Sequence, residues 1–193
     1  MSSSVGTPAA SFSPPGESVE ERLRRLEQRI ATLEERAPED RVAIVVFSGD
    51  LDRVMAAFII ATGAAAMGQQ VSMFFTFWGL GVIKKRKEMA GKTFFQMMMT
   101  AMTPGSSQQL PVSRMNYFGM GSVMLRAMMK DQKVSSLEEM IALARELGVR
   151  MTACEMSREV MGIRDSELGE GFECGGVATF LADSLVSRTS LFI

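Results

Sequence analysis

The chain has 193 residues, which is enough for one domain of ordinary size and an appendage of about forty residues. Hydrophobic residues make up 47% and charged residues 22%, as in globular proteins, and the net charge of −1 predicts no nucleic-acid partner. Because the sequence contains no histidine and only two cysteines, it excludes Ser-His-Asp and Cys-His catalytic sites, structural zinc sites and disulfide frameworks.

The N-terminal residues 1–16 are rich in Ser, Pro and Gly, a composition that predicts a disordered tail. This stretch lacks the basic and apolar regions of a secretory signal, and the scarcity of cysteine fits a reducing compartment. We therefore expect a cytoplasmic protein.

Residues 17–38 follow the seven-residue pattern of a coiled coil. Apolar side chains recur at alternating steps of four and three, at Val19, Leu23, Leu26, Ile30, Leu33 and Ala37. With Leu23 at position a of a parallel assembly, Arg22 meets Glu27 of the neighbouring helix, whereas in an antiparallel assembly arginine would face arginine. The pattern predicts a parallel homo-oligomer, with a trimer favoured over a dimer. The alternative is a monomeric amphipathic helix docked on its own domain, because fewer than three full heptads are marginally stable alone.

Beyond Pro38, strands and helices alternate along the chain. Residues 41–47 form an unbroken run that is mainly β-branched and aromatic, which is typical of a strand covered on both faces. Further strands are expected at 70–77, 149–153 and 190–193, and helices at 51–67, 136–147, 156–161 and 176–185. This order predicts an α/β domain over residues 41–193, with a three-layer α/β/α, doubly wound and mainly parallel sheet of about five strands.

A methionine-dense insertion at about residues 84–130 interrupts this alternation. The loop 104–109 divides it, so neither half reaches the roughly twenty residues of a membrane-spanning helix. Thioether side chains make adaptable apolar surfaces, so the insertion is either a docking patch for a partner or a membrane surface, or it fills the core or an oligomer interface. Its basic start, residues 84–87, would attract an acidic partner, a phosphorylated ligand or an anionic membrane, although a solvated helix end is the simpler interpretation.

Two Gly-x-Gly pairs, at residues 79–81 and 119–121, lack the third glycine of the dinucleotide-binding pattern. Asp50 and Asp52, which follow the first strand, would also repel an anion at the next helix N-terminus. We therefore expect neither a cofactor nor a metal. Helix capping is the simplest interpretation of the two carboxylates, and the alternatives are an acid/base pair, a magnesium site or a supporting role near a thiol.

Cys154 is the strongest candidate for a chemical centre. It lies between strand 149–153 and the following helix, at the carboxyl edge of the sheet, where doubly wound folds place their sites. A helix N-terminus stabilises a thiolate, although Glu155 and Glu159 oppose this and free cysteines are often buried. Cys174 is either a resolving partner that forms a reversible disulfide with Cys154 or, more simply, a bystander.

Several motifs of residues 41–193 occur together in one order. They are Ser48-Gly49-Asp50-Leu51-Asp52, Ala64-Ala65-Ala66-Met67-Gly68, Phe74-Phe75-Thr76-Phe77-Trp78-Gly79-Leu80, Ala153-Cys154-Glu155-Met156-Ser157 with Val160-Met161-Gly162, and Gly175-Gly176-Val177-Ala178-Thr179. In this order they resemble the DsrE/DsrF-like family of sulfur-trafficking proteins, in particular stand-alone members with a methionine-rich insertion.

This resemblance implies a sulfur carrier or sulfurtransferase that holds sulfane sulfur as a persulfide on Cys154, the family cysteine. Its partners would be a sulfur donor protein and a sulfur acceptor protein. Supporting site residues are expected in the same motifs, namely Gly49, Asp50, Asp52, Glu155, Met156 and Ser157. The alternative functions are a non-enzymatic oligomeric module that uses the methionine-rich patch to bind a partner or membrane surface, and a flavin- or nicotinamide-binding oxidoreductase.

Overall fold

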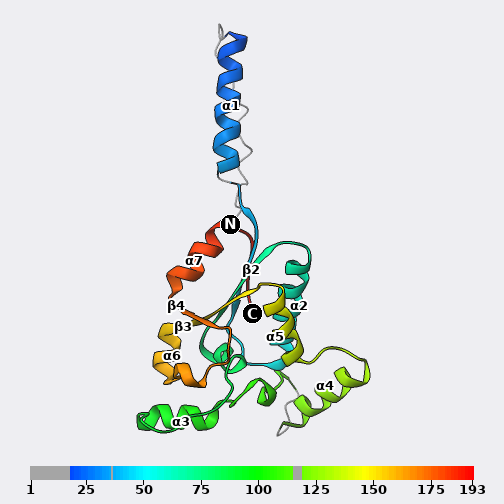
Figure 1. Ribbon diagram of the computed structural model, residues 1–193, viewed down its shortest axis with the longest axis vertical. Coiled ribbons are helices and arrows are strands. Elements are labelled where there is room, and N and C mark those ends of the chain that lie inside the picture. The colour runs from blue at the N-terminus through cyan, green and yellow to red at the C-terminus, as the bar shows by residue number, and fades with distance from the viewer. Residues whose placement is uncertain (1–17, 36, 115–118) are drawn as a thin grey trace, which may run out of the picture. The chain divides into compact units, whose positions relative to one another are not determined.

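The computed structural model describes residues 18–35, 37–114 and 119–193, so the expected disordered tail at residues 1–16 lies outside the described residues. The chain divides into two compact units, residues 1–37 and residues 38–193. In its described residues the first unit has the helix α1, and the second unit has a sheet with its helices (Figure 1).

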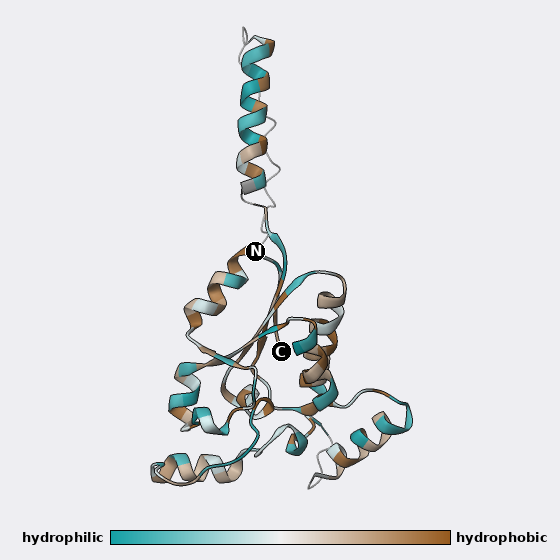
Figure 2. Cartoon of the chain, viewed as in Figure 1, coloured by the Kyte–Doolittle hydropathy of each residue, from teal (hydrophilic) through white to brown (hydrophobic). Residues whose placement is uncertain are grey.

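The helix of the first unit, α1 (Val19–Glu35), begins with a reciprocal cap. The backbone N–H of Glu21 donates to the Ser18 hydroxyl, and the backbone N–H of Ser18 donates to the Glu21 carboxylate. The apolar residues of the heptad pattern are exposed along α1 among charged residues (Figure 2). A stripe of this kind needs a partner surface to cover it, and the parallel coiled coil stays a prediction.

The second unit is built on five parallel strands in the order β4-β3-β2-β1-β5. Their bounds are β1 Glu39–Val46, β2 Gln70–Phe75, β3 Arg150–Cys154, β4 Glu173–Gly175 and β5 Ser187–Phe192. The predicted parallel sheet of about five strands is therefore confirmed. The expected last strand is present as β5, whereas the three-residue strand β4 was missing from the predicted elements.

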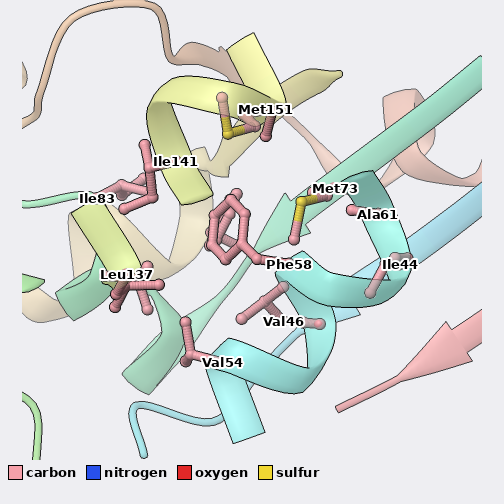
Figure 3. Close-up of a cluster of buried hydrophobic side chains, with 14 of the residues drawn as sticks. Ile44, Val46, Val54, Phe58, Ala61, Met73, Ile83, Leu137, Ile141 and Met151 are labelled. Carbon is pink, nitrogen blue, oxygen red and sulfur yellow. The ribbon is translucent and has the colours of Figure 1, made fainter. Parts of the chain in front are cut away.

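Helices cover both faces of the sheet, which confirms the three-layer α/β/α architecture. The bounds are α2 Leu51–Ala66, α5 Leu137–Glu146, α6 Glu155–Met161 and α7 Val177–Val186. On one face, Phe58 of α2 is fully buried among side chains that include Met73 and Met151 (Figure 3). On the other face, Phe180 of α7 packs on Phe74 with the ring centroids 5.5 Å apart. Because Met73 and Phe74 are neighbours on β2, their side chains point to opposite faces.

Strand β2 ends at Phe75, earlier than the expected Phe77. After Thr76 the chain enters a 3-10 helix, η1 (Phe77–Val82). The backbone N–H of Gly79 donates to the Phe47 carbonyl at 2.9 Å, so the chain folds across the carboxyl end of β1 instead of extending the strand. A β-carbon at Gly79 would collide with the Val46 carbonyl oxygen, which explains why glycine is needed for this close approach.

The described residues of the methionine-rich insertion include the helices α3 (Phe94–Met102) and α4 (Met120–Asp131). Between them the expected loop includes a short 3-10 turn, Ser107–Gln109, and residues 115–118 lie outside the described residues. Among the helices that the structure describes, none is long and apolar enough to cross a membrane.

The start of the insertion differs from the expected solvated helix end. Lys84 is 5% exposed, and its ammonium lies 3.6 Å from the Glu167 carboxylate. The backbone beside it is held as well, because the N–H of Lys85 donates to the Glu167 carbonyl. The interpretation of Lys84 as solvated was wrong, because a partner distant in the sequence buries it, whereas Lys85, Arg86 and Lys87 are exposed.

Candidate functional site

Cys154 lies at the carboxyl edge of the sheet, where β3 passes directly into α6. The strand is buried from Met151 to Cys154, and Cys154 is the residue at which the helix begins, with φ −66° and ψ 115°. Parallel strands end at the same edge of a sheet, so the segments that follow β1 and β2 lie at this edge too.

Two hydroxyl groups connect Cys154 to the end of β2. The Ser157 hydroxyl donates to Cys154 Sγ at 3.3 Å, and Ser157 Oγ lies 2.7 Å from Thr76 Oγ1. Ser157 has a single hydroxyl proton, so when it donates to the sulfur, the Thr76 hydroxyl must donate to Ser157. This chain of hydroxyls therefore directs a hydrogen-bond donor at the Cys154 sulfur.

The Cys154 thiol and the Ser157 hydroxyl are buried on the inner side of α6, and Thr76 is half-buried. Cys154 is 5% exposed and Ser157 is fully buried, whereas Met156 and Val160 on the outer side of α6 are 64% and 65% exposed. Of the supporting residues expected beside Cys154, Ser157 therefore contacts the thiol, while Glu155 and Met156 face solvent. Cys154 is therefore largely shielded from solvent.

The two carboxylates that follow β1 serve the turn and the insertion. Asp50 begins α2 without a side-chain capping bond, and its carboxylate accepts from the Ser48 hydroxyl at 3.0 Å and lies 3.7 Å from Arg53. Asp52 accepts from the backbone N–H and the hydroxyl of Ser113. Burial raises the pKa of Asp52, but the hydrogen bonds from Ser113 outweigh it and leave the pKa below its usual value. These contacts do not bring either carboxylate to Cys154.

Gly49 allows two loops of this edge to pack closely. A β-carbon there would lie 2.9 Å from the Trp78 carbonyl oxygen, so a larger residue would push η1 away from the turn after β1. In the part of the chain that the structure describes, no group of three or more His, Cys, Asp or Glu side chains is placed to hold a metal ion.

Cys174 lies on β4, next to β3, but its side chain points to the opposite face of the sheet from that of Cys154. The strand register pairs Ala153 with Cys174 and Cys154 with Gly175. Paired residues of parallel strands point to the same face, and successive residues alternate, so the two thiols face away from each other. A disulfide between them would require this register to break, which argues against a resolving role for Cys174.

The surroundings of Cys174 also make it a weak nucleophile. Its Sγ lies 2.7 Å from the Arg158 guanidinium and 3.6 Å from the Asp165 carboxylate. Partial burial raises the pKa of the Cys174 thiol, and the neighbouring Arg158 does not fully offset this effect. The thiolate, which is the reactive form, is therefore scarce at neutral pH.

Thr76 is the residue of this site that sequence reasoning missed. It directly follows β2, and the pairing of Phe75 with Ala153 brings Thr76 beside Cys154. The available signal was a hydroxyl residue at the end of an apolar strand. Using that signal requires the knowledge that β2 and β3 are neighbours in the sheet, although the whole insertion separates them in the sequence.

Comparisons with known proteins find relatives of the second unit. The model of the DsrE/DsrF/DrsH-like family matches residues 38–192. The uncharacterized protein YrkE of Bacillus subtilis is 40% identical over 154 residues, which cover 79% of this chain and 96% of YrkE. The sulfur carrier protein DsrE2 of Allochromatium vinosum is 32% identical over 158 residues, which cover 80% of this chain and 99% of DsrE2. Among solved structures, the YchN protein of E. coli matches with a TM-score of 0.47 and 11% identity, over 79% of this chain and 98% of YchN.

Proposed function

The chain belongs to the DsrE/DsrF/DrsH-like family, and from this premise we propose that it is a sulfur carrier that holds sulfane sulfur as a persulfide on Cys154. It receives this sulfur from a donor protein and relays it to an acceptor protein. The relative DsrE2, which is named a sulfur carrier protein and matches over 99% of its length, supports a sulfur-relay role. The observation that carries the proposal is the hydrogen bond from the buried Ser157 hydroxyl to Cys154 Sγ at the carboxyl edge of the sheet.

Loading and unloading of Cys154 are both thiol exchange reactions. In loading, the Cys154 thiolate attacks the outer sulfur of a donor persulfide, a new S–S bond forms, the S–S bond of the donor breaks, and the donor leaves as a thiolate. In unloading, an acceptor thiolate attacks that same outer sulfur and Cys154 leaves as a thiolate. In each step one S–S bond forms and one breaks, so there is no net oxidation or reduction and the exchange requires no added oxidant or reductant.

The hydroxyl chain acts on the charged forms of Cys154. Negative charge resides on Sγ before loading and returns to Sγ during unloading, when Cys154 is the leaving group. A hydrogen bond to an ionised group is roughly twice as strong as a neutral one, so the Ser157 hydroxyl favours both charged states. The exposed Met156 and Val160 provide an apolar surface beside the thiol on which a donor or acceptor protein can dock.

Mass measurement after incubation with polysulfide tests the role of Cys154. We expect wild type and Cys174→Ser to gain sulfur atoms that dithiothreitol removes, and Cys154→Ser to gain none. The proposal is contradicted if Cys154→Ser gains as much sulfur as the wild type. It is also contradicted if the wild type gains none and Cys154 resists iodoacetamide until the protein is unfolded.

A second candidate function, docking to a membrane surface through the insertion, is favoured by the exposure of α3. Phe94 and Phe95 are 71% and 72% exposed, and Met98 and Met102 continue the same apolar face. The exposed basic residues 85–87 precede this helix. Co-sedimentation with phosphatidylglycerol vesicles tests this function, and binding should be lost in Phe94→Ser/Phe95→Ser but retained in Val123→Ser on α4. If the wild type stays in the supernatant, membrane docking is refuted.

A further inference from the structure

A small cavity of about 300 Å³ lies at the carboxyl edge of the sheet, beside the turn that follows β1. Its walls are mainly apolar and are formed by Phe47, Trp78, Pro104, Pro111, Met161 and Ile163. The two prolines come from the insertion, so the insertion completes one wall of the cavity. Cavities at this edge that combine apolar walls with a few polar groups are the usual place for small ligands in such folds.

Three charged residues line the cavity, namely Asp50, Arg53 and Lys84. Asp50 is already engaged, since its carboxylate accepts from the Ser48 hydroxyl and lies 3.7 Å from the guanidinium of Arg53. The two cations and one anion give the lining a net charge of +1, and Arg53 keeps guanidinium donors that its 3.7 Å contact with Asp50 does not use.

Lys84 belongs to a buried cluster in which positive charge exceeds negative charge. Glu167 is the shared counter-ion of Lys84 and Lys92, and the side chains of all three are no more than 2% exposed. The carboxylate is held closely by Lys92 at 2.7 Å and by the backbone N–H groups of Glu88 and Arg164, both at 3.0 Å, whereas Lys84 is 3.6 Å away. Burial lowers the pKa of Lys84, because the shared carboxylate compensates its charge incompletely.

We infer that this cavity binds a small organic monoanion, a carboxylate with a compact apolar body, and that Lys84 and Arg53 hold the carboxylate. An ammonium has three donors, and an anion in the cavity would accept from the donors of Lys84 that Glu167 does not use. A single negative charge would neutralise the net charge of the lining, whereas a dianion would leave one negative charge uncompensated beside Asp50. The apolar walls would bury the body of the ligand. This inference is independent of sulfur transfer at Cys154.

Trp78 provides a direct measurement, because it is the single tryptophan of the chain and lines the cavity. The full-length protein is titrated with cyclohexanecarboxylate while tryptophan fluorescence is recorded, and the neutral cyclohexanecarboxamide is titrated as a ligand of the same shape. We expect a saturable change in fluorescence with the carboxylate. The carboxamide should bind at least about tenfold more weakly, since a hydrogen-bonded charge is lost. Equal binding of both ligands, or no saturable change with the carboxylate, would overturn the inference.

Lys84→Met tests the residue that holds the anion. The substitution leaves one ammonium, Lys92, with one carboxylate, Glu167, so the cluster stays balanced and the variant should fold, which its melting temperature checks. Carboxylate binding should weaken about tenfold or more, whereas Lys85→Met, at an exposed lysine outside the cavity, should bind as the wild type does. Wild-type affinity in Lys84→Met would overturn the inference. If Lys84→Met fails to fold, Arg53→Gln is measured instead. Carboxylate binding as strong as in the wild type would then overturn the inference.

Discussion

At the level of single residues, Ser157 and Thr76 are the groups that act on the Cys154 sulfur. Ser157→Ala removes the hydroxyl that donates to Sγ, and Thr76→Val removes the hydroxyl that orients Ser157. We expect sulfur transfer from Cys154 to a thiol acceptor to slow roughly ten- to a hundredfold in Ser157→Ala and less in Thr76→Val, because a hydrogen bond to a charged group is worth about 1.5–3 kcal/mol. Single-turnover transfer from the persulfidated protein, followed by intact mass, measures both rates.

Two buried hydroxyl residues elsewhere in the second unit provide matched controls. Thr62 donates to the Phe58 carbonyl within α2, and Ser107 donates to the Glu138 carboxylate at 2.7 Å. Thr62→Val and Ser107→Ala should transfer sulfur at the wild-type rate even where their stability is lower. A wild-type rate in Ser157→Ala would show that the hydroxyl chain has a structural role alone.

Among the elements, one buried carboxylate, Glu167, connects the insertion to the turn that follows α6. Glu167 lies in the loop after α6 and accepts hydrogen bonds from Lys92 and from the backbone N–H of Glu88, which are both in the insertion. Burial raises the pKa of Glu167, but its hydrogen bonds outweigh this and hold the pKa below the ordinary value of 4.5. As the pH falls, Glu167 therefore binds a proton at a higher pH in the unfolded chain than in the folded one. The ionised carboxylate stabilises the fold above pH 4.5, and this stability is lost as the pH falls through the lower folded-state pKa.

Glu167→Gln should lower the free energy of unfolding by about 3 kcal/mol at pH 7, because two buried ammonium groups lose their counter-ion. Urea unfolding at pH 7 and pH 3 measures this, and the wild type should lose more stability between the two pH values than the variant. Glu170→Gln, at an exposed glutamate just beyond the same turn, should have the same free energy of unfolding as the wild type at both pH values. If Glu167→Gln loses as much stability between pH 7 and pH 3 as the wild type does, other carboxylates determine the loss of stability in acid.

Elements with local signals could be predicted from the sequence, and elements that depend on distant partners could not. The apolar run 42–47 and the strand before Cys154 each carry their own pattern, so the edge position of Cys154 followed from the sequence alone. Strand β4 has no such pattern, since Glu173-Cys174-Gly175 is extended only because β3 offers it an edge to pair with. The burial of Lys84 and Lys92 depends in the same way on Glu167, which follows Lys92 by 75 residues.

For the whole molecule, the oligomeric state depends on whether other copies of the chain cover the apolar stripe of α1. Its heptad residues are between 44% and 80% exposed, at Val19, Leu23, Leu26, Ile30 and Leu33. Apolar area on this scale along one helix is stabilising only when a partner covers it, and the charges beside the stripe pair correctly in a parallel arrangement. The unit of residues 38–192, which matches the family, does not include this helix. Assembly through α1 would therefore be a property of this chain in addition to its family role.

We expect the full-length protein to form a trimer in solution, measured by light scattering after size-exclusion chromatography. Leu26→Asp places one carboxylate from each helix at position d of the seam, where like charges would meet in an apolar interface, so the mass should fall to that of the monomer. Gln28→Asp adds the same charge at the outer position f and should leave the trimer intact. A dimeric wild type would correct the number of helices in the coil. A trimeric mass that Leu26→Asp leaves unchanged would mean that the second unit assembles without α1. A monomeric wild type would refute assembly through α1.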